Sequence, residues 1–213
     1  MNIIYYLIIA FVMTRIPILR VYVRLINTMI HEVCHIIVAT ITGGKGHKIT
    51  LHRDTSGLAL TSSSSWFSRV FTAYAGYTGS SLVAFLLFYL LQEGYYTVVL
   101  LVLMSVLIIA TLLWVRNGFG SLWAASFLLL IWLLIDKQFD QITIHLSYLL
   151  SAVLLVESVS SALQVMLISF KQPKDAGDAT ALQKFTFIPA LIWGILFFIQ
   201  SIYIGYKIVL QHV

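Results

Sequence analysis

Long apolar runs constrain the fold of this chain more than any other feature. Most of them reach the length of about twenty residues that crosses the hydrocarbon core of a bilayer. Apolar residues make up 60% of the 213 residues and charged residues only 10%, whereas charged residues make up about 25% of soluble domains. The chain is therefore expected to fold in a lipid bilayer. The runs fall near residues 2–19, 25–42, 69–92, 95–115, 119–135, 142–170 and 186–210.

Backbone hydrogen bonding in lipid narrows the fold class. Only helices and closed barrels satisfy every backbone group there, and the alternation of period two that is typical of a barrel is absent. Arg15 and Pro17 interrupt the first run, and the fifth run is short. We predict an all-α, polytopic transmembrane bundle of six or seven helices in a single domain over residues 1–213. The first run lacks a basic segment before it and a cleavage site, so it is expected to stay as a helix.

Two polar stretches separate the runs. Residues 43–68 alternate polar and β-branched residues around a glycine turn, which predicts a short β-hairpin beside the membrane. The second stretch is "KQPKDAGDATALQK", residues 171–184, before the last helix. If successive helices cross the membrane in opposite directions, one membrane face carries only a small excess of basic residues over the other. The orientation of the chain therefore stays open. Arg15, Arg20, Arg24, Lys137 and Lys207 would then lie opposite the two polar stretches and loop 116–118.

The net charge of +5 does not indicate a nucleic-acid partner. The basic residues lie between apolar runs, where they orient helices and meet anionic lipid headgroups. A basic stripe interleaved with aromatic residues, as nucleic-acid binding requires, is absent. A single cysteine, Cys34, excludes an intramolecular disulfide framework and a Cys-rich metal site.

The stretch "NTMIHEVCHIIVATITGG", residues 27–44, places ionisable side chains inside an apolar helix. Such groups are costly in lipid and by default indicate a function. His31 and His35 are one helical turn apart, so both imidazoles can bind one zinc ion. Glu32 then lies beside the metal as a general base that takes a proton from water and passes it to the leaving amine. The competing interpretation is a buried His–Glu pair that holds two helices together.

A catalytic zinc usually has three protein ligands, so one more is needed. From the residues alone, several acids and histidines remain open as candidates. Glu157 lies within an apolar run, so it needs an internal partner and could orient a ligand histidine. Asp178 opens the last helix, where helix caps are common. The remaining candidates are Asp54, Glu93, Asp136, Asp140, Asp175, His47, His52, His145 and His212.

Five segments in this order resemble the M50 metallopeptidases, the site-2 protease group, and in particular their M50B-like branch. The first is the H-E-x-x-H segment, which Gly43-Gly44 and the basic loop follow. The others are "AGYTG" (75–79), "RNGFG" (116–120), "GDATAL" (177–182), and Pro189 with Trp193.

The resemblance implies a zinc-dependent endopeptidase that cleaves membrane proteins in or near their transmembrane segments. It also implies that the third ligand is an aspartate from a distant helix, which favours Asp178, with Asp175 next. A regulatory PDZ domain has no counterpart here, so substrate selection would depend on the helices, the 43–68 loop or a membrane partner. The expected location is the plasma membrane. The rival functions are a transporter or proton relay, and a zinc-binding scaffold without proteolysis.

Overall fold

The computed structural model describes residues 2–136 and 140–212. Among these residues, five helices are long and apolar enough to cross a membrane, namely α2, α3, α4, α6 and α8. The predicted helical bundle with a small hairpin is therefore confirmed. The side chains of Asp136, Asp140 and His212, which were candidates above, lie outside the described part. The elements are α1 (Ile3–Met13), α2 (Pro17–Ile41), β1 (Lys45–Leu51), β2 (Gly57–Ser62), α3 (Trp66–Gln92), α4 (Tyr96–Leu113), α5 (Gly118–Asp136), α6 (Asp140–Lys171), α7 (Asp178–Thr186) and α8 (Ala190–His212).

Two boundaries differ from the prediction. The first apolar run is divided, because Thr14 ends α1 and Pro17 occupies the first turn of α2, a position that proline favours. Asp178 does not open the last helix. It opens α7, a separate helix of nine residues that ends at Phe187 in a left-handed conformation before α8 begins.

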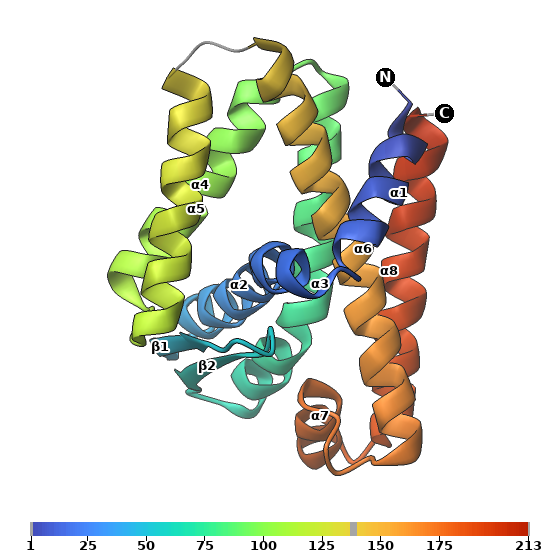
Figure 1. The fold of residues 1–213 in the computed structure, drawn as a ribbon. Helices are drawn as coiled ribbons and strands as arrows, with labels where there is room; N and C mark the ends of the chain where they lie inside the picture. Colours follow the sequence, from blue (N-terminus) through green and yellow to red (C-terminus); the bar gives the residue numbers. More distant parts are fainter. Residues whose placement is uncertain (1, 137–139, 213) are drawn as a thin grey trace.

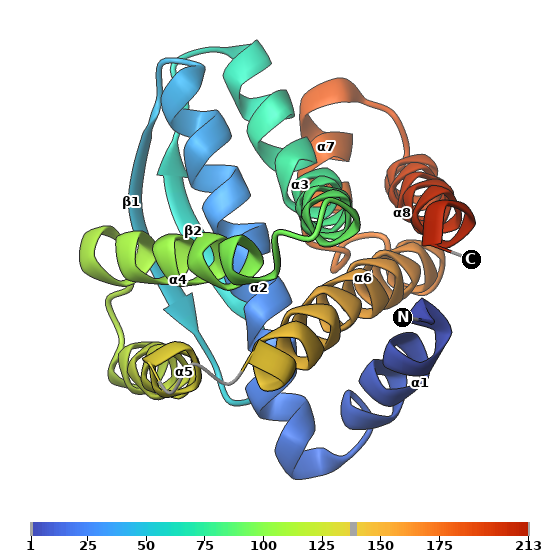
Figure 2. The same cartoon turned by 90° about the horizontal axis from the view of Figure 1, so that it is seen from above.

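The helices do not all run in the same direction. In Figure 1, α1, α6 and α8 stand upright side by side, and both chain ends lie at the upper end of the bundle. Helix α2 runs crosswise to them, which Figure 2 shows along its full length. Its most extensive contacts are with α3, followed by β1 and β2. The crosswise course lets one helix present several of its turns to the hairpin, α3 and α6 together.

The two strands form an antiparallel hairpin in which Ile49 pairs with Ala59 and Leu51 with Gly57. The outer edge of β1 is already paired. Ile49 exchanges backbone hydrogen bonds with residues 114 and 116, and the Asn117 carboxamide binds both the N–H and the C=O of Leu51, at 3.1 and 2.6 Å. The outer edge of β2 faces α2 and the cavity described below. The hairpin therefore offers one edge to a further strand.

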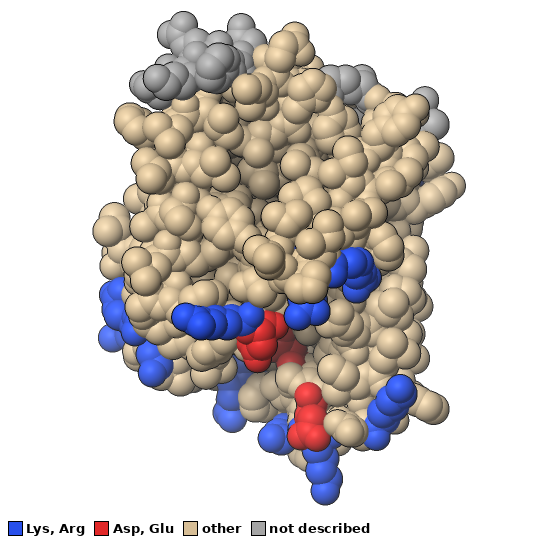
Figure 3. Space-filling view, viewed as in Figure 1, with Lys and Arg blue, Asp and Glu red and all other residues tan. Residues whose placement is uncertain are grey.

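Most charged side chains lie at one end of the bundle. On the face seen in Figure 3, no charged side chain of the described residues lies in the upper half, and charged side chains lie from the middle downward, where acidic residues sit in a hollow between basic ones. In Figure 1 the α1–α2 corner lies near the middle of the bundle, at the level of α2, so Arg15, Arg20 and Arg24 are on the side of the hairpin and not at the opposite end. Among the described basic residues, only Lys207, near the end of α8, belongs to the other end.

We expect Asn117→Leu to destabilise the hairpin. Leu51 is fully buried, so the substitution would leave its N–H and C=O without partners, at about 1–3 kcal/mol for each group. The midpoint of thermal unfolding in detergent should fall by several degrees. The Ser121→Ala variant, one helical turn further along, is the control and should unfold like the wild type. Equal midpoints for both variants would contradict the role of Asn117.

Candidate metal centre

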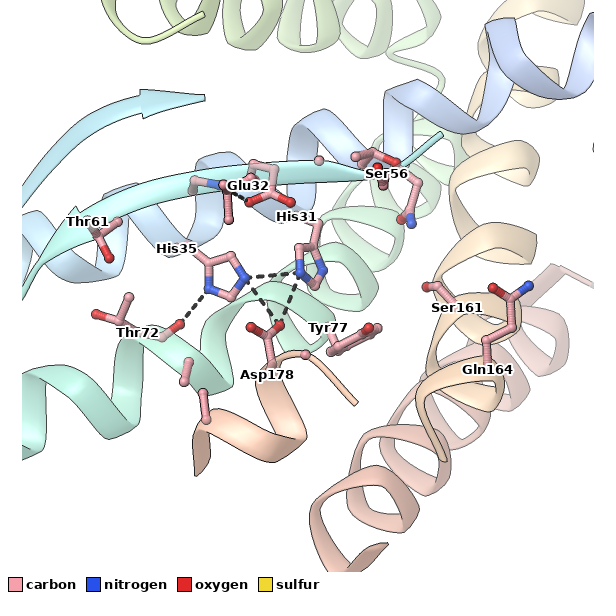
Figure 4. Close-up of a pocket in the computed structure, with 18 of the residues that line it drawn as sticks. His31, Glu32, His35, Ser56, Thr61, Thr72, Tyr77, Ser161, Gln164 and Asp178 are labelled. Atoms are coloured by element: carbon pink, nitrogen blue, oxygen red, sulfur yellow. Dashed lines mark hydrogen bonds and ion pairs between the residues drawn. The ribbon is translucent and has the colours of Figure 1, made fainter. Parts of the chain in front are cut away.

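Three side chains from two helices converge at one point. His31 and His35 lie one turn apart on α2, and Asp178 is the first residue of α7. The two Nε2 atoms are 3.0 Å apart, and Asp178 Oδ2 lies 3.1 Å from the first and 3.2 Å from the second. Figure 4 shows the three groups pointing toward one another between β2 and α3. The residues predicted as ligands are therefore brought together in space.

The orientation of His35 follows from a backbone contact. Its Nδ1 lies 2.6 Å from the carbonyl oxygen of Thr72. Because a carbonyl only accepts hydrogen bonds, Nδ1 carries the proton, and Nε2 of the neutral ring has a free lone pair. This lone pair points toward Asp178. A hydrogen bond from the far nitrogen to a backbone carbonyl is the usual arrangement of histidines that bind metals.

The carboxylate of Asp178 is held by the packing of α7. The Thr180 hydroxyl accepts from the N–H of Ala176 at 2.9 Å and donates to the C=O of Pro173 at 2.7 Å, which fixes the turn before the helix. At the other end, the indole of Trp66 donates to the C=O of Phe185 at 2.6 Å. Burial raises the pKa of the Asp178 carboxyl, whereas a positive charge on the adjacent imidazoles of His35 and His31, from a bound proton, outweighs burial and holds that pKa below its usual range.

Helix α3 approaches the cluster closely because it carries a glycine there. A Cβ at Gly76 would come within 2.6 Å of His35 Nε2 and would also meet the His31 ring. The Tyr77 ring lies edge-on to the His31 ring, with centroids 4.7 Å apart. Three residues further along α3, Gly79 faces Cys34. Gly76 and Gly79 therefore allow α3 to pack closely against α2, and at Gly76 this packing adjoins the site.

Glu32 is buried between the cluster and the hairpin. Its Oε2 accepts the N–H of Ala59 in β2 at 2.6 Å, and no hydrogen bond to Oε1 is recorded among the described residues. Figure 4 shows the Glu32 carboxylate on the β2 side of the two imidazoles. The glutamate therefore connects the open edge of β2 with the cluster.

The donor set fits a zinc ion. Two imidazole nitrogens and one carboxylate oxygen are common zinc ligands at about 2.0–2.2 Å. Two such ligands at a tetrahedral angle are about 3.3 Å apart, close to the 3.0–3.2 Å that separates these atoms. Three atoms with free lone pairs repel one another at this distance unless a proton or a cation lies between them. Three protein ligands also leave a fourth position for water or substrate.

The other candidate residues lie elsewhere. The suggestion that Glu157 orients a ligand histidine is wrong, because its Oε2 pairs with Arg24 Nε at 2.6 Å; the internal partner expected for it is therefore Arg24. His47 binds Ser62, and His145 binds Tyr6. Asp175 is exposed and does not join the cluster of described ligand atoms. The same holds for His52 and Glu93, whereas Asp54 lines the cavity.

The cluster opens into a cavity of about 870 Å³. Its walls come from α2, the open edge of β2, α3, α6 and α7, and Figure 4 shows Ser161 and Gln164 on α6 across from the cluster. Sequence reasoning missed Thr72, Tyr77 and Asn27, which all line this cavity. For Tyr77, the "AGYTG" motif was a signal, and for Asn27 its place one turn before His31 was another.

Comparison with known proteins gave one match. A family model described as Peptidase M50B-like matches residues 3–207, nearly the whole chain. No curated protein and no solved structure matched.

We expect Gly76→Ala to disrupt the cluster. The added methyl group would meet both imidazoles, so the zinc affinity of the purified protein should fall at least about tenfold, the size of effect that a misplaced ligand produces. Zinc titration with a competing chelator measures this. The control is Gly118→Ala, where a Cβ would meet nothing within 4 Å. Wild-type affinity in the Gly76→Ala variant would contradict the close approach of α3.

Proposed function

The chain belongs to the Peptidase M50B-like family of membrane metallopeptidases, and from this we propose that it is an intramembrane zinc endopeptidase. The observation that supports the proposal best is the convergence of His31, His35 and Asp178 within 3.2 Å, beside the buried Glu32. We propose these three residues as the zinc ligands and Glu32 as the general base. The substrate would be a membrane protein, cut in or next to a transmembrane segment.

In this mechanism the residues of the chain position the reactants and move one proton. A zinc ion at the cluster would supply a Lewis acid that polarises the scissile carbonyl and makes a water molecule more acidic. Glu32 takes a proton from the attacking water and then gives it to the leaving amine nitrogen. Thr72 holds the His35 ring in the tautomer whose Nε2 is free to bind metal. Proton transfer of this kind contributes about 10²–10⁴-fold to a rate.

The open edge of β2 is the proposed substrate-binding strand. An extended segment can add to a sheet edge through main-chain hydrogen bonds, and this edge lines the cavity next to the cluster. The Ala59 N–H belongs to this edge and is bound by Glu32. A substrate strand that takes over this N–H would release the Glu32 carboxylate for the attacking water. Binding of an unwound segment and activation of the base are then coupled.

The distribution of charge supports an orientation. Membrane proteins carry an excess of Lys and Arg on cytoplasmic segments, and all described basic residues except Lys207 lie on elements in the half of the molecule that holds α2, the hairpin and α7. We propose that this end faces the cytoplasm, so that the cavity opens on that side. We propose the plasma membrane as the location, and either the substrate itself or a membrane partner would supply the regulation.

We expect Glu32→Gln to reduce cleavage of a membrane-protein reporter by about 10²–10⁴-fold. Glutamine keeps the size of the side chain and an oxygen for the Ala59 N–H, but it does not accept a proton. Zinc content should stay at the wild-type level, whereas Asp178→Asn should lower it.

Glu93→Gln is the matched control for this experiment, because Glu93 is exposed at the far end of α3, and it should cleave like the wild type. Undiminished cleavage by the Glu32→Gln variant would rule out the proposed base. Transport activity without any cleavage by the wild type would rule out the peptidase.

Cysteine labelling tests the orientation. In a Cys34→Ala background, we expect a membrane-impermeant maleimide to label a Tyr95→Cys variant in intact cells, because Tyr95 lies between α3 and α4 at the end opposite the hairpin and α7. A Lys48→Cys variant in β1 should react only after permeabilisation. The reverse pattern would contradict the proposed orientation.

A further inference from the structure

A buried carboxamide oxygen without a hydrogen-bond partner belongs to a residue that lines the cavity near the proposed metal ligands. Asn27 is only 5% exposed, and its Oδ1 has no hydrogen-bond partner among the described residues. The residue lines the same cavity as His31, His35 and Asp178. Buried polar groups in proteins are nearly always hydrogen-bonded. An unpaired amide inside a binding cavity therefore points to a ligand group that completes it.

Its neighbours on the same helix already have partners. Arg24 Nε binds Glu157, and the Thr28 hydroxyl donates to the C=O of Thr55 at 2.8 Å. Neither contact involves the Asn27 carboxamide. Along this part of α2, Asn27 is thus the buried polar side chain that the described fold leaves unsatisfied.

The position of Asn27 along α2 would allow it to contact the main chain of an extended segment bound at the cluster. Asn27, His31 and His35 follow one another at intervals of four residues, so they lie along one face of α2. Four residues of helix rise about 6 Å, and an extended chain covers this distance in about two residues. Asn27 would therefore face a residue about two positions away from the scissile bond.

Strand β2 follows the same stretch of α2. Thr55, just before the strand, binds Thr28, and Ala59 within the strand binds Glu32. Between them, a Cβ at Gly57 would come within 2.6 Å of the Thr28 methyl group and 2.8 Å of Glu32. A segment that pairs with the open edge of β2 would consequently run along the face of α2 that carries Asn27 and His31.

The fold already contains a contact of the required kind. Asn117 binds the N–H and the C=O of Leu51 with one carboxamide, at 3.1 and 2.6 Å. The oxygen of an asparagine side chain can accept the N–H of a strand residue, and its NH2 group can donate to the C=O of the same residue. The contact involves only main-chain groups of the bound residue and does not depend on its side chain.

We propose that Asn27 is a positioning residue that binds the N–H and C=O of one substrate residue, about two positions from the scissile bond. This inference rests on the proposed function and adds to it a second main-chain contact, from α2, on the extended segment that pairs with β2. A helical segment does not satisfy Asn27, because its N–H and C=O groups are bonded within the helix.

Binding to the inactive Glu32→Gln protein tests the inference without cleavage. The probe is a fluorescent peptide that covers the cleavage site of the membrane-protein reporter, and its Kd is measured by fluorescence anisotropy in detergent. Adding Asn27→Leu, which keeps a similar volume and removes the amide, should raise the Kd at least about tenfold, because one main-chain contact is lost. Thr111→Val is the control, since it also removes a buried unpartnered oxygen, but one outside the cavity.

A peptide with an ester in place of one amide identifies the bound group. With Asn27 present, the ester at the matching position should weaken binding, because an ester lacks the N–H. With Asn27→Leu, the same ester should have no further effect. An unchanged Kd in the Asn27→Leu variant, or an ester effect that is independent of Asn27, would overturn the inference.

The two proposals fail in different ways. If the wild type cleaves the reporter and Glu32→Gln does not, the proposed function stands whatever the Asn27 result. If Asn27→Leu then leaves the Kd unchanged, only the inference is wrong. In the active background, Asn27→Leu should raise KM more than it lowers kcat, which a general loss of folding would not do.

Discussion

Two imidazoles and a carboxylate converge within 3.2 Å, and the packing of the surrounding elements has to make this convergence possible. These atoms come from two helices that are far apart in the sequence, and their lone pairs repel one another unless a proton or a cation lies between them. Each approach therefore needs its own support: Gly76 lets α3 come close, Thr72 holds the His35 ring, and the packing of α7 fixes Asp178. A bound cation would turn this repulsion into attraction, which is how metal binding and folding become coupled.

Polar groups inside a membrane protein need hydrogen-bond or ion-pair partners. In this chain, contacts between two neighbouring helices or strands supply most of these partners. Arg24 and Glu157 form an ion pair between α2 and α6, and Glu157 is only 3% exposed. Breaking such a pair leaves a buried charge and costs about 3–5 kcal/mol, although the intact pair adds little stability. The pair therefore lets two charged side chains line the cavity without leaving either charge unpaired. Against this background two buried side-chain oxygens in the residues that line the cavity have no partner among the described residues, Asn27 Oδ1 and Thr72 Oγ1.

The sequence predicted what depends on local spacing and missed what depends on distant contacts. The interval between His31 and His35 predicts a shared face of one helix, and the alternation after Gly44 predicts the hairpin. The family resemblance, and not any local pattern, favoured Asp178 over the other acids. Apolar length does not reveal that α2 runs crosswise, and with this course the α1–α2 corner lies near the middle of the bundle, level with α2. The partner of Glu157 lies 133 residues away, so no periodicity could identify it.

The size of the cavity favours an extended substrate over a helical one. A helix with its side chains is about 10–12 Å across and rises 5.4 Å per turn, so each turn occupies about 500 Å³. The cavity of about 870 Å³ would then hold fewer than two turns, or about six residues. Six residues in an extended conformation span about 20 Å, which is also the length of β2 with its six residues. An unwound segment of this length can pair along the whole strand, whereas a helix of equal volume would meet it over less than half of that distance.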